Sequence, residues 1–164
     1  MSIRTELKKF CKSFTYAGSG ILRCIKTQRN MRFHIGAAGA VLALSAISGV
    51  THSEAISLII IVGGVMALEC VNTAIEFLTD LACKGKRSEY AKAAKDCAAG
   101  AVLVFCFAAI GAAIVIFGKR VSEIISVFFE KPLLILAAVI YCAIWFWWVF
   151  LCFQNDDKIK RKKV

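Results

Sequence analysis

The chain has 164 residues, of which 59% are hydrophobic and 20% are charged, and its mean hydropathy is +0.71. Soluble domains are about 45–50% apolar, so this composition excludes a water-soluble globular protein. The single proline excludes collagen-like and proline-rich disordered chains. The net charge of +10 must therefore lie outside the apolar stretches. The sequence predicts an all-α integral membrane protein.

The first segment, residues 1–32, predicts an amphipathic helix on the membrane surface. Leu7, Phe10 and Phe14 alternate with Lys8 and Lys12, which is the pattern of a helix lying in the interface. Four apolar stretches follow, each near the roughly 20 residues that cross a bilayer core. The expected spans are 35–50, 55–82, 93–118 and 133–153. We expect a core of three spans at 33–118, then a fourth span with a basic tail at 119–164.

The distribution of Lys and Arg predicts the orientation. Of the 21 basic residues, 18 precede the first span, lie between positions 84 and 95, or follow position 156. Short loops rich in Lys and Arg stay cytosolic, so both termini and the loop between the second and third spans are expected to face the cytosol. The basic tail is interpreted as a topology signal attracted to anionic lipids, and no nucleic-acid partner is expected.

The second expected span contains a polar stripe. Glu69, Asn72, Glu76 and Asp80 fall on one helical face at 100° per residue. The stripe is roughly 16 Å long. A carboxylate in the bilayer costs at least about 2.5 kcal/mol, so it needs a cation, a proton or water. Hydrogen bonding between helices would account for Asn72, but three acids on one stripe favour a functional site.

A second polar patch, Lys95 and Asp96, lies at the cytosolic start of the third span, at the depth of Asp80. Alone it would indicate an ordinary pair at a helix start; beside the acidic stripe it is a candidate phosphate-binding group. The sequence has no phosphate-binding loop and no protein-kinase signature. Acids for Mg²⁺, basic groups for phosphate and a carboxylate base favour phosphoryl transfer from ATP to a lipid hydroxyl.

Three motifs resemble those of the small bacterial diacylglycerol kinase and undecaprenol kinase family. They are E-x-x-N-T-A-I-E-x-x-x-D at 69–80, A-K-D-x-A-A-G-A-V-L-V at 94–104 and R-N-M-R-F-H at 29–34. The resemblance covers about residues 5–118. It implies an ATP- and Mg²⁺-dependent lipid kinase of the bacterial plasma membrane, with a surface helix and three spans per subunit. It also implies a homotrimer whose sites are shared between subunits.

The resemblance further implies a role for individual residues. Glu69 matches the general base that acts on the lipid hydroxyl, and Glu76 matches the cation ligand, which also contacts the nucleotide. Asn72 and Asp80 match their polar support. The other expected nucleotide-binding residues are Tyr16, Lys86, Arg87, Ser88, Lys95 and Asp96. The other expected lipid-binding residues are Met31, Arg32, His34 and Ala99.

The chain departs from the family pattern in two places. The family has a glutamate just before the R-N-M-R-x-H segment, and that residue shares the cation, whereas this chain has Thr27 and Gln28 there. We expect the amide oxygen of Gln28, or a water, to take the place of the carboxylate at the metal. The fourth span and its tail are absent from three-span relatives, and their role could be packing, localisation or a partner site.

Other functions are left open by the sequence. The motif variants favour undecaprenol as the lipid, with diacylglycerol as the alternative, because both lipids present a primary hydroxyl at the interface. The missing glutamate leaves a catalytically weak relative with a binding or partner role as a further hypothesis. An ion or proton carrier is disfavoured, because the paired broken-helix repeats of many transporters are lacking.

Overall fold

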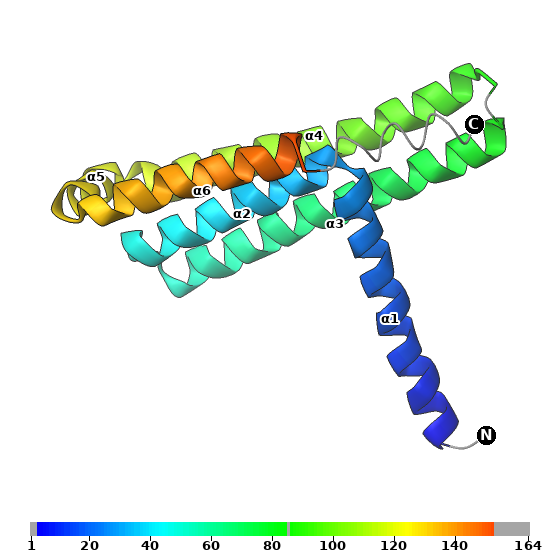
Figure 1. Cartoon of the computed structure of the whole chain (residues 1–164), viewed down its shortest axis with the longest axis horizontal. Helices are drawn as coiled ribbons and strands as arrows, with labels where there is room; N and C mark the ends of the chain where they lie inside the picture. Colours follow the sequence, from blue (N-terminus) through cyan, green and yellow to red (C-terminus); the bar gives the residue numbers. More distant parts are fainter. Residues whose placement is uncertain (1–2, 85, 153–164) are drawn as a thin grey trace.

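The computed structural model describes residues 3–84 and 86–152, which form six helices and no strand. They are α1 (Ile3–Thr27), α2 (Arg29–Ser48), α3 (His52–Cys83), α4 (Glu89–Gly118), α5 (Val121–Glu130) and α6 (Pro132–Phe150). Helix α3 packs against α2 and α4, α6 packs against α2, and α1 projects from this bundle (Figure 1). The all-α prediction is confirmed.

Four of these helices, α2, α3, α4 and α6, are long and apolar enough to cross a membrane. This agrees with the four predicted spans. The fourth span was expected to reach Phe153, but that residue and the basic tail lie outside the described residues. Where a loop was expected between α4 and α6, the chain forms the short helix α5. Pro132 at the start of α6 separates the two helices, because proline disfavours a helical conformation of the residue before it.

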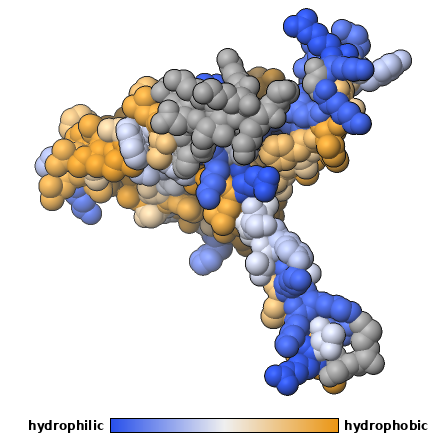
Figure 2. All heavy atoms as spheres, turned by 45° about the vertical axis from the view of Figure 1, so that its right-hand side comes forward, coloured by the Kyte–Doolittle hydropathy of each residue, from blue (hydrophilic) through white to orange (hydrophobic). Residues whose placement is uncertain are grey.

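Helix α1 exposes its apolar face. Phe10 and Phe14 are 62% and 65% exposed, and their rings meet edge to face with centroids 5.0 Å apart. Among the described residues of α1, only Cys24 is buried. Figure 2 shows hydrophilic side chains along α1 and at the α3–α4 end, and hydrophobic ones over the bundle. These surfaces suit a helix in the membrane interface beside a bundle in the bilayer.

The α2–α3 turn is fixed by its capping residues. Gly49 ends α2 with a φ of 62°, a left-handed conformation that glycine adopts without steric cost. Thr51 then starts α3 with a capping box: its Oγ1 accepts from the Glu54 amide (3.4 Å), and its own amide donates to Oε2 of Glu54 (2.8 Å). The turn therefore orients the Glu54 carboxylate.

That carboxylate joins the start of α3 to the end of α4. Arg120 donates to both oxygens of Glu54, at 3.1 and 2.7 Å, and to the carbonyl oxygen of Ile116 at 2.7 Å. Lys119 Nζ lies 2.6 Å from Oε1 of Glu54. Arg120 is 9% exposed, whereas the side chain of Lys119 is 59% exposed. The bidentate Arg120–Glu54 pair is therefore the main tie at this end of the bundle.

We predict that Arg120→Ala lowers the thermal unfolding midpoint more than Lys119→Ala. Removing Arg120 leaves a partly buried carboxylate without its bidentate partner, whereas an exposed lysine contributes little to an ion pair. Thermal unfolding of both variants in lipid nanodiscs measures the difference. Equal losses in the two variants would show that the bidentate geometry is unimportant.

Candidate functional site

The polar stripe on α3 passes from a buried to an exposed environment. Glu69 is 1% exposed and Asn72 is 5% exposed, Glu76 is half-buried, and Asp80 is exposed. Oε2 of Glu69 and Oδ1 of Asn72 make no hydrogen bond with any described residue. Buried acceptors without donors are costly, so these two oxygens are candidate acceptors for a hydroxyl donor.

A second set of contacts, which the sequence analysis missed, holds α1 against this stripe. Cys24 Sγ lies 3.1 Å from Thr73 Oγ1 and 3.9 Å from the Glu69 carbonyl oxygen. The Thr73 hydroxyl donates to that same carbonyl at 2.8 Å. Burial raises the pKa of the Cys24 thiol to about 11, outweighing the opposite effect of its contact with Thr73. The end of α1 therefore packs against the backbone that carries Glu69.

Gln28, the single residue between α1 and α2, faces Glu76. Its amide Nε2 donates to Oε2 of Glu76 at 2.7 Å. The expected cation ligand here was the amide oxygen of Gln28 or a water, whereas in the structure the NH₂ group of Gln28 meets the Glu76 carboxylate. Among the described residues no three His, Cys, Asp or Glu side chains cluster closely enough to hold a metal. A divalent cation at Glu76 would therefore take most of its ligands from phosphate and water.

Where α3 turns into α4, a polar pocket of about 470 Å³ brings together six of the expected residues. These are Asp80, Lys86, Arg87, Ser88, Lys95 and Asp96. Lys95 Nζ donates to Oδ1 of Asp80, joining α4 to α3. Ser88 caps α4, since its Oγ accepts from the Ala91 amide at 3.4 Å. Basic side chains around a helix N-terminus form an environment suited to phosphate.

Tyr16 does not belong to this pocket. It lies on α1, is 61% exposed, and has Lys12 Nζ 5.6 Å from the centre of its ring. Its expected contact with the nucleotide is therefore not formed within the pocket of one subunit.

The expected lipid-binding residues occupy different surroundings. Met31 is 1% exposed and Arg32 is 6% exposed. Arg32 donates to the carbonyl oxygens of Ile25 at 3.0 Å and Val149 at 3.3 Å, so its position is determined by packing between helices. His34 instead lines an apolar pocket between α2, α3 and α4, and Ala99 is exposed on α4.

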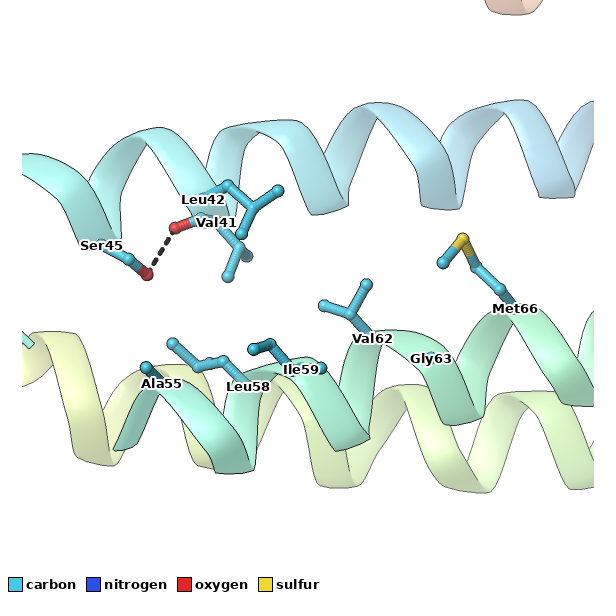
Figure 3. A pocket seen from close by; sticks show the side chains of 9 residues that line it. All are labelled: Val41, Leu42, Ser45, Ala55, Leu58, Ile59, Val62, Gly63 and Met66. Carbon is cyan, nitrogen blue, oxygen red and sulfur yellow. Dashed lines mark hydrogen bonds between the residues drawn. The ribbon is translucent and has the colours of Figure 1, made fainter. Parts of the chain in front are cut away.

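Two apolar pockets lie beside the contact between α2 and α3. The first, of about 180 Å³, includes His34 and reaches Val65, one helical turn from Glu69. The second, of about 330 Å³, extends along α3 to Ala55 (Figure 3). Both are lined by Val41 and Val62. The one hydroxyl lining the second pocket, that of Ser45, donates to the Val41 carbonyl oxygen at 2.7 Å. The two pockets therefore suit hydrocarbon chains.

The family model described as prokaryotic diacylglycerol kinase matches residues 15–117. The chain is 46% identical to an undecaprenol kinase of Bacillus subtilis (strain 168) over 102 residues, which are 62% of this chain and 82% of that protein. It is 43% identical to a diacylglycerol kinase of Synechocystis sp. over 101 residues, which are 60% of this chain and 56% of that protein. No solved structure matches it significantly.

We predict that Cys24 resists alkylation in the folded protein while Cys11, exposed on the same helix, reacts. The thiolate is the reactive form, and a pKa of about 11 leaves roughly one Cys24 in a thousand ionised at pH 8. Iodoacetamide labelling at pH 8, followed by peptide mass spectrometry, measures both sites. Rapid labelling of Cys24 in the native state would contradict its packing against Thr73.

Proposed function

We propose that this chain, which belongs to the prokaryotic diacylglycerol kinase family and is therefore a lipid kinase, uses ATP and Mg²⁺ to phosphorylate undecaprenol. Lipid kinases are phosphotransferases that act on an alcohol group. The product would be undecaprenyl phosphate. The α3–α4 end of the bundle would face the cytosol, as the distribution of basic residues predicts.

The main observation behind this proposal is that Oε2 of the buried Glu69 has no hydrogen-bond partner among the described residues and that Glu69 lies one turn from Val65, which lines an apolar pocket. A lipid whose chain lies in this pocket would bring its hydroxyl to this depth. Oε2 of Glu69 would accept the hydroxyl proton as the oxygen attacks the terminal phosphate, which is general-base catalysis. The unpartnered Oδ1 of Asn72, next on the stripe, supports a role in orienting the hydroxyl.

The nucleotide would bind at the other end of the stripe. The α3–α4 pocket has more basic than acidic residues in its lining, which favours phosphate. The basic residues are Lys86, Arg87, Lys92 and Lys95, and the acidic ones are Asp80, Glu89 and Asp96. Glu76 lies between this pocket and Glu69 along α3, about 10 Å from Glu69 along the helix axis. ATP, the phosphoryl donor, would therefore reach α3 from the aqueous side, and the lipid hydroxyl, the acceptor, would reach it from the membrane.

Glu76 and Gln28 would hold Mg²⁺ together with the phosphates. Mg²⁺ is commonly bound through one or two carboxylates, phosphate oxygens and water, so the single carboxylate of Glu76 fits a cation that arrives with the nucleotide. When bound, the cation neutralises charge on the transferred phosphate. The Gln28 amide would orient Glu76 for this cation through its 2.7 Å hydrogen bond.

One observation favours undecaprenol over diacylglycerol. The similarity to the undecaprenol kinase covers 82% of that protein, whereas the similarity to the diacylglycerol kinase covers 56% of its counterpart. The second apolar pocket runs along α3 from Met66 to Ala55, about 16 Å, which suits a hydrocarbon chain of either lipid. We further propose a homotrimer, in which Tyr16 of one subunit would reach the nucleotide pocket of another.

Phosphate transfer from labelled ATP, with undecaprenol and diacylglycerol offered separately to the purified protein in mixed micelles, tests the proposal. We expect faster labelling of undecaprenol. Faster labelling of diacylglycerol would overturn the choice of substrate, and labelling of neither lipid would overturn the activity.

We predict that Glu69→Gln lowers phosphate transfer by about 10²–10⁴-fold, the usual contribution of a general base, while nucleotide binding is retained. Glu76→Gln should instead weaken Mg²⁺-dependent nucleotide binding, because it removes the carboxylate proposed to bind the cation. Turnover and equilibrium binding of ATP, measured on both variants, separate the two roles. Near-native turnover of Glu69→Gln would contradict its role as base.

We also predict that Gln28→Glu lowers the Mg²⁺ concentration that gives half-maximal activity. A second carboxylate facing Glu76 adds an attraction of about 1–4 kcal/mol for a nearby cation, so a decrease of at least about fivefold is expected.

Thr27→Glu is the matched control, because the Thr27 hydroxyl donates to the Arg23 carbonyl oxygen and no hydrogen bond joins it to Glu76. An equal shift in both variants would indicate a general effect of negative charge, and no shift with Gln28→Glu would separate Gln28 from the metal.

A further inference from the structure

Helices α5 and α6 lie beyond residues 15–117, which match the family, and α6 packs against α2 (Figure 1). Lipid solvates an apolar helix as well as another apolar helix does, so helices associate in a bilayer through close packing and hydrogen bonds. Close packing and hydrogen bonds between particular residues therefore hold α6 on α2. These residues show which part of the molecule α6 keeps in place.

The first group of contacts is formed where two aromatic side chains of α6 pack directly on two glycines of α2. A Cβ atom at Gly36 would overlap the indole ring of Trp145, and one at Gly39 would overlap the Tyr141 hydroxyl. The Tyr141 hydroxyl donates to the carbonyl oxygen of Gly36. The ring of Trp145 also meets that of Phe33, with centroids 5.1 Å apart. The absence of side chains at these two positions is what lets the aromatic residues of α6 reach the α2 backbone.

The second group joins the end of α6 to the elbow between α1 and α2. One guanidinium nitrogen of Arg32 donates to the carbonyl oxygens of Ile25 and Lys26, at 3.0 and 3.3 Å, and the other donates to that of Val149 at 3.3 Å. A cation is favourable at a helix C-terminus, and here one cation serves the C-termini of both α1 and α6. The Arg29 guanidinium lies over the ring of Phe150, 5.5 Å from its centre.

The same elbow carries Gln28. Its backbone amide donates to the Cys24 carbonyl oxygen at 2.8 Å, and its side chain donates to Glu76. The elbow is therefore held from two sides, by α6 through Arg32 and Arg29, and by α3 through Glu76 and Thr73. A displacement of α6 would loosen the segment that positions the Gln28 amide.

We propose that α6 is a positioning element for the nucleotide side of the site: it holds the α1–α2 elbow so that Gln28 faces Glu76. This inference rests on the proposed function in taking Glu76 as the Mg²⁺ ligand. Tyr141, Trp145 and Phe150 act through the elbow and are positioning residues. A helix that served only as a membrane anchor would have no effect on Mg²⁺ dependence.

The test uses Gly36→Ala in the full-length protein, because the added methyl group would displace Trp145 and move α6 away from α2. Gly111→Ala on α4 is the matched control, since a Cβ there meets open space. Two quantities are measured: alkylation of Cys24 relative to Cys11 at pH 8, and the Mg²⁺ concentration for half-maximal lipid phosphorylation. We expect Gly36→Ala to raise both by about threefold to tenfold, the range of modest energetic coupling.

Tyr141→Phe is the second variant, since it removes the hydroxyl bonded to Gly36 and keeps the ring. We expect smaller shifts in the same direction. The proposal is overturned if both variants match Gly111→Ala in Cys24 labelling, or if Cys24 labels faster while the Mg²⁺ requirement stays unchanged.

Failure of the proposed function is distinguishable from failure of this inference. If the native protein phosphorylates neither lipid, the Mg²⁺ dependence of ATP binding, measured by equilibrium dialysis on the same variants, replaces the activity measurement. Binding that is insensitive to Gly36→Ala and Tyr141→Phe, or that is absent altogether, would then overturn the positioning role.

Discussion

The length of α3 is the constraint on which the rest of the structure depends. Its 32 residues make a helix of about 48 Å, whereas the hydrocarbon core of a bilayer is about 30 Å thick. One rigid helix therefore carries Glu69 at a depth where water is excluded and Asp80 at a level where it is abundant. A hydroxyl that arrives through the membrane and a phosphate that arrives through water can meet along such a helix without either substrate changing phase.

The sequence was sufficient to predict this helix and its polar face. Twenty apolar residues have few stable structures in lipid other than a helix, and a fixed 100° per residue then aligns Glu69 with Glu76. The partners of that face could not be predicted in the same way. Periodicity states which side of a helix is polar, but not which helix packs there, so the contacts of Cys24 with Thr73 and of Arg32 with Val149 appear only in the folded chain.

The expectation for Gln28 shows the same limit at the level of one side chain. The family pattern drew attention to this position because a carboxylate is missing there. Only the structure adds that the amide turns its donor toward Glu76. An amide can donate a hydrogen bond to a carboxylate through its NH₂ group, or coordinate a cation through its oxygen. An ionised glutamate can only coordinate the cation. The substitution therefore lets the pair remain satisfied without a metal, which two facing carboxylates could not achieve without a proton or a counter-ion.

The two ends of the bundle use similar ion pairs for different purposes. At the end where α3 begins, the largely buried Arg120 donates to both carboxylate oxygens of Glu54. The Thr51 amide also donates to this carboxylate, which therefore has little freedom to move. Where α3 ends, the side chains of Lys95 and Asp80 are 36% and 68% exposed and share a single contact. Exposed pairs contribute only about 0–1 kcal/mol to stability, so the Lys95–Asp80 pair costs little to open. Lys95, which lines the polar pocket and is held only by this weak pair, is therefore able to leave Asp80 for a phosphate. Arg120 could not leave Glu54 without weakening the contact between α3 and α4.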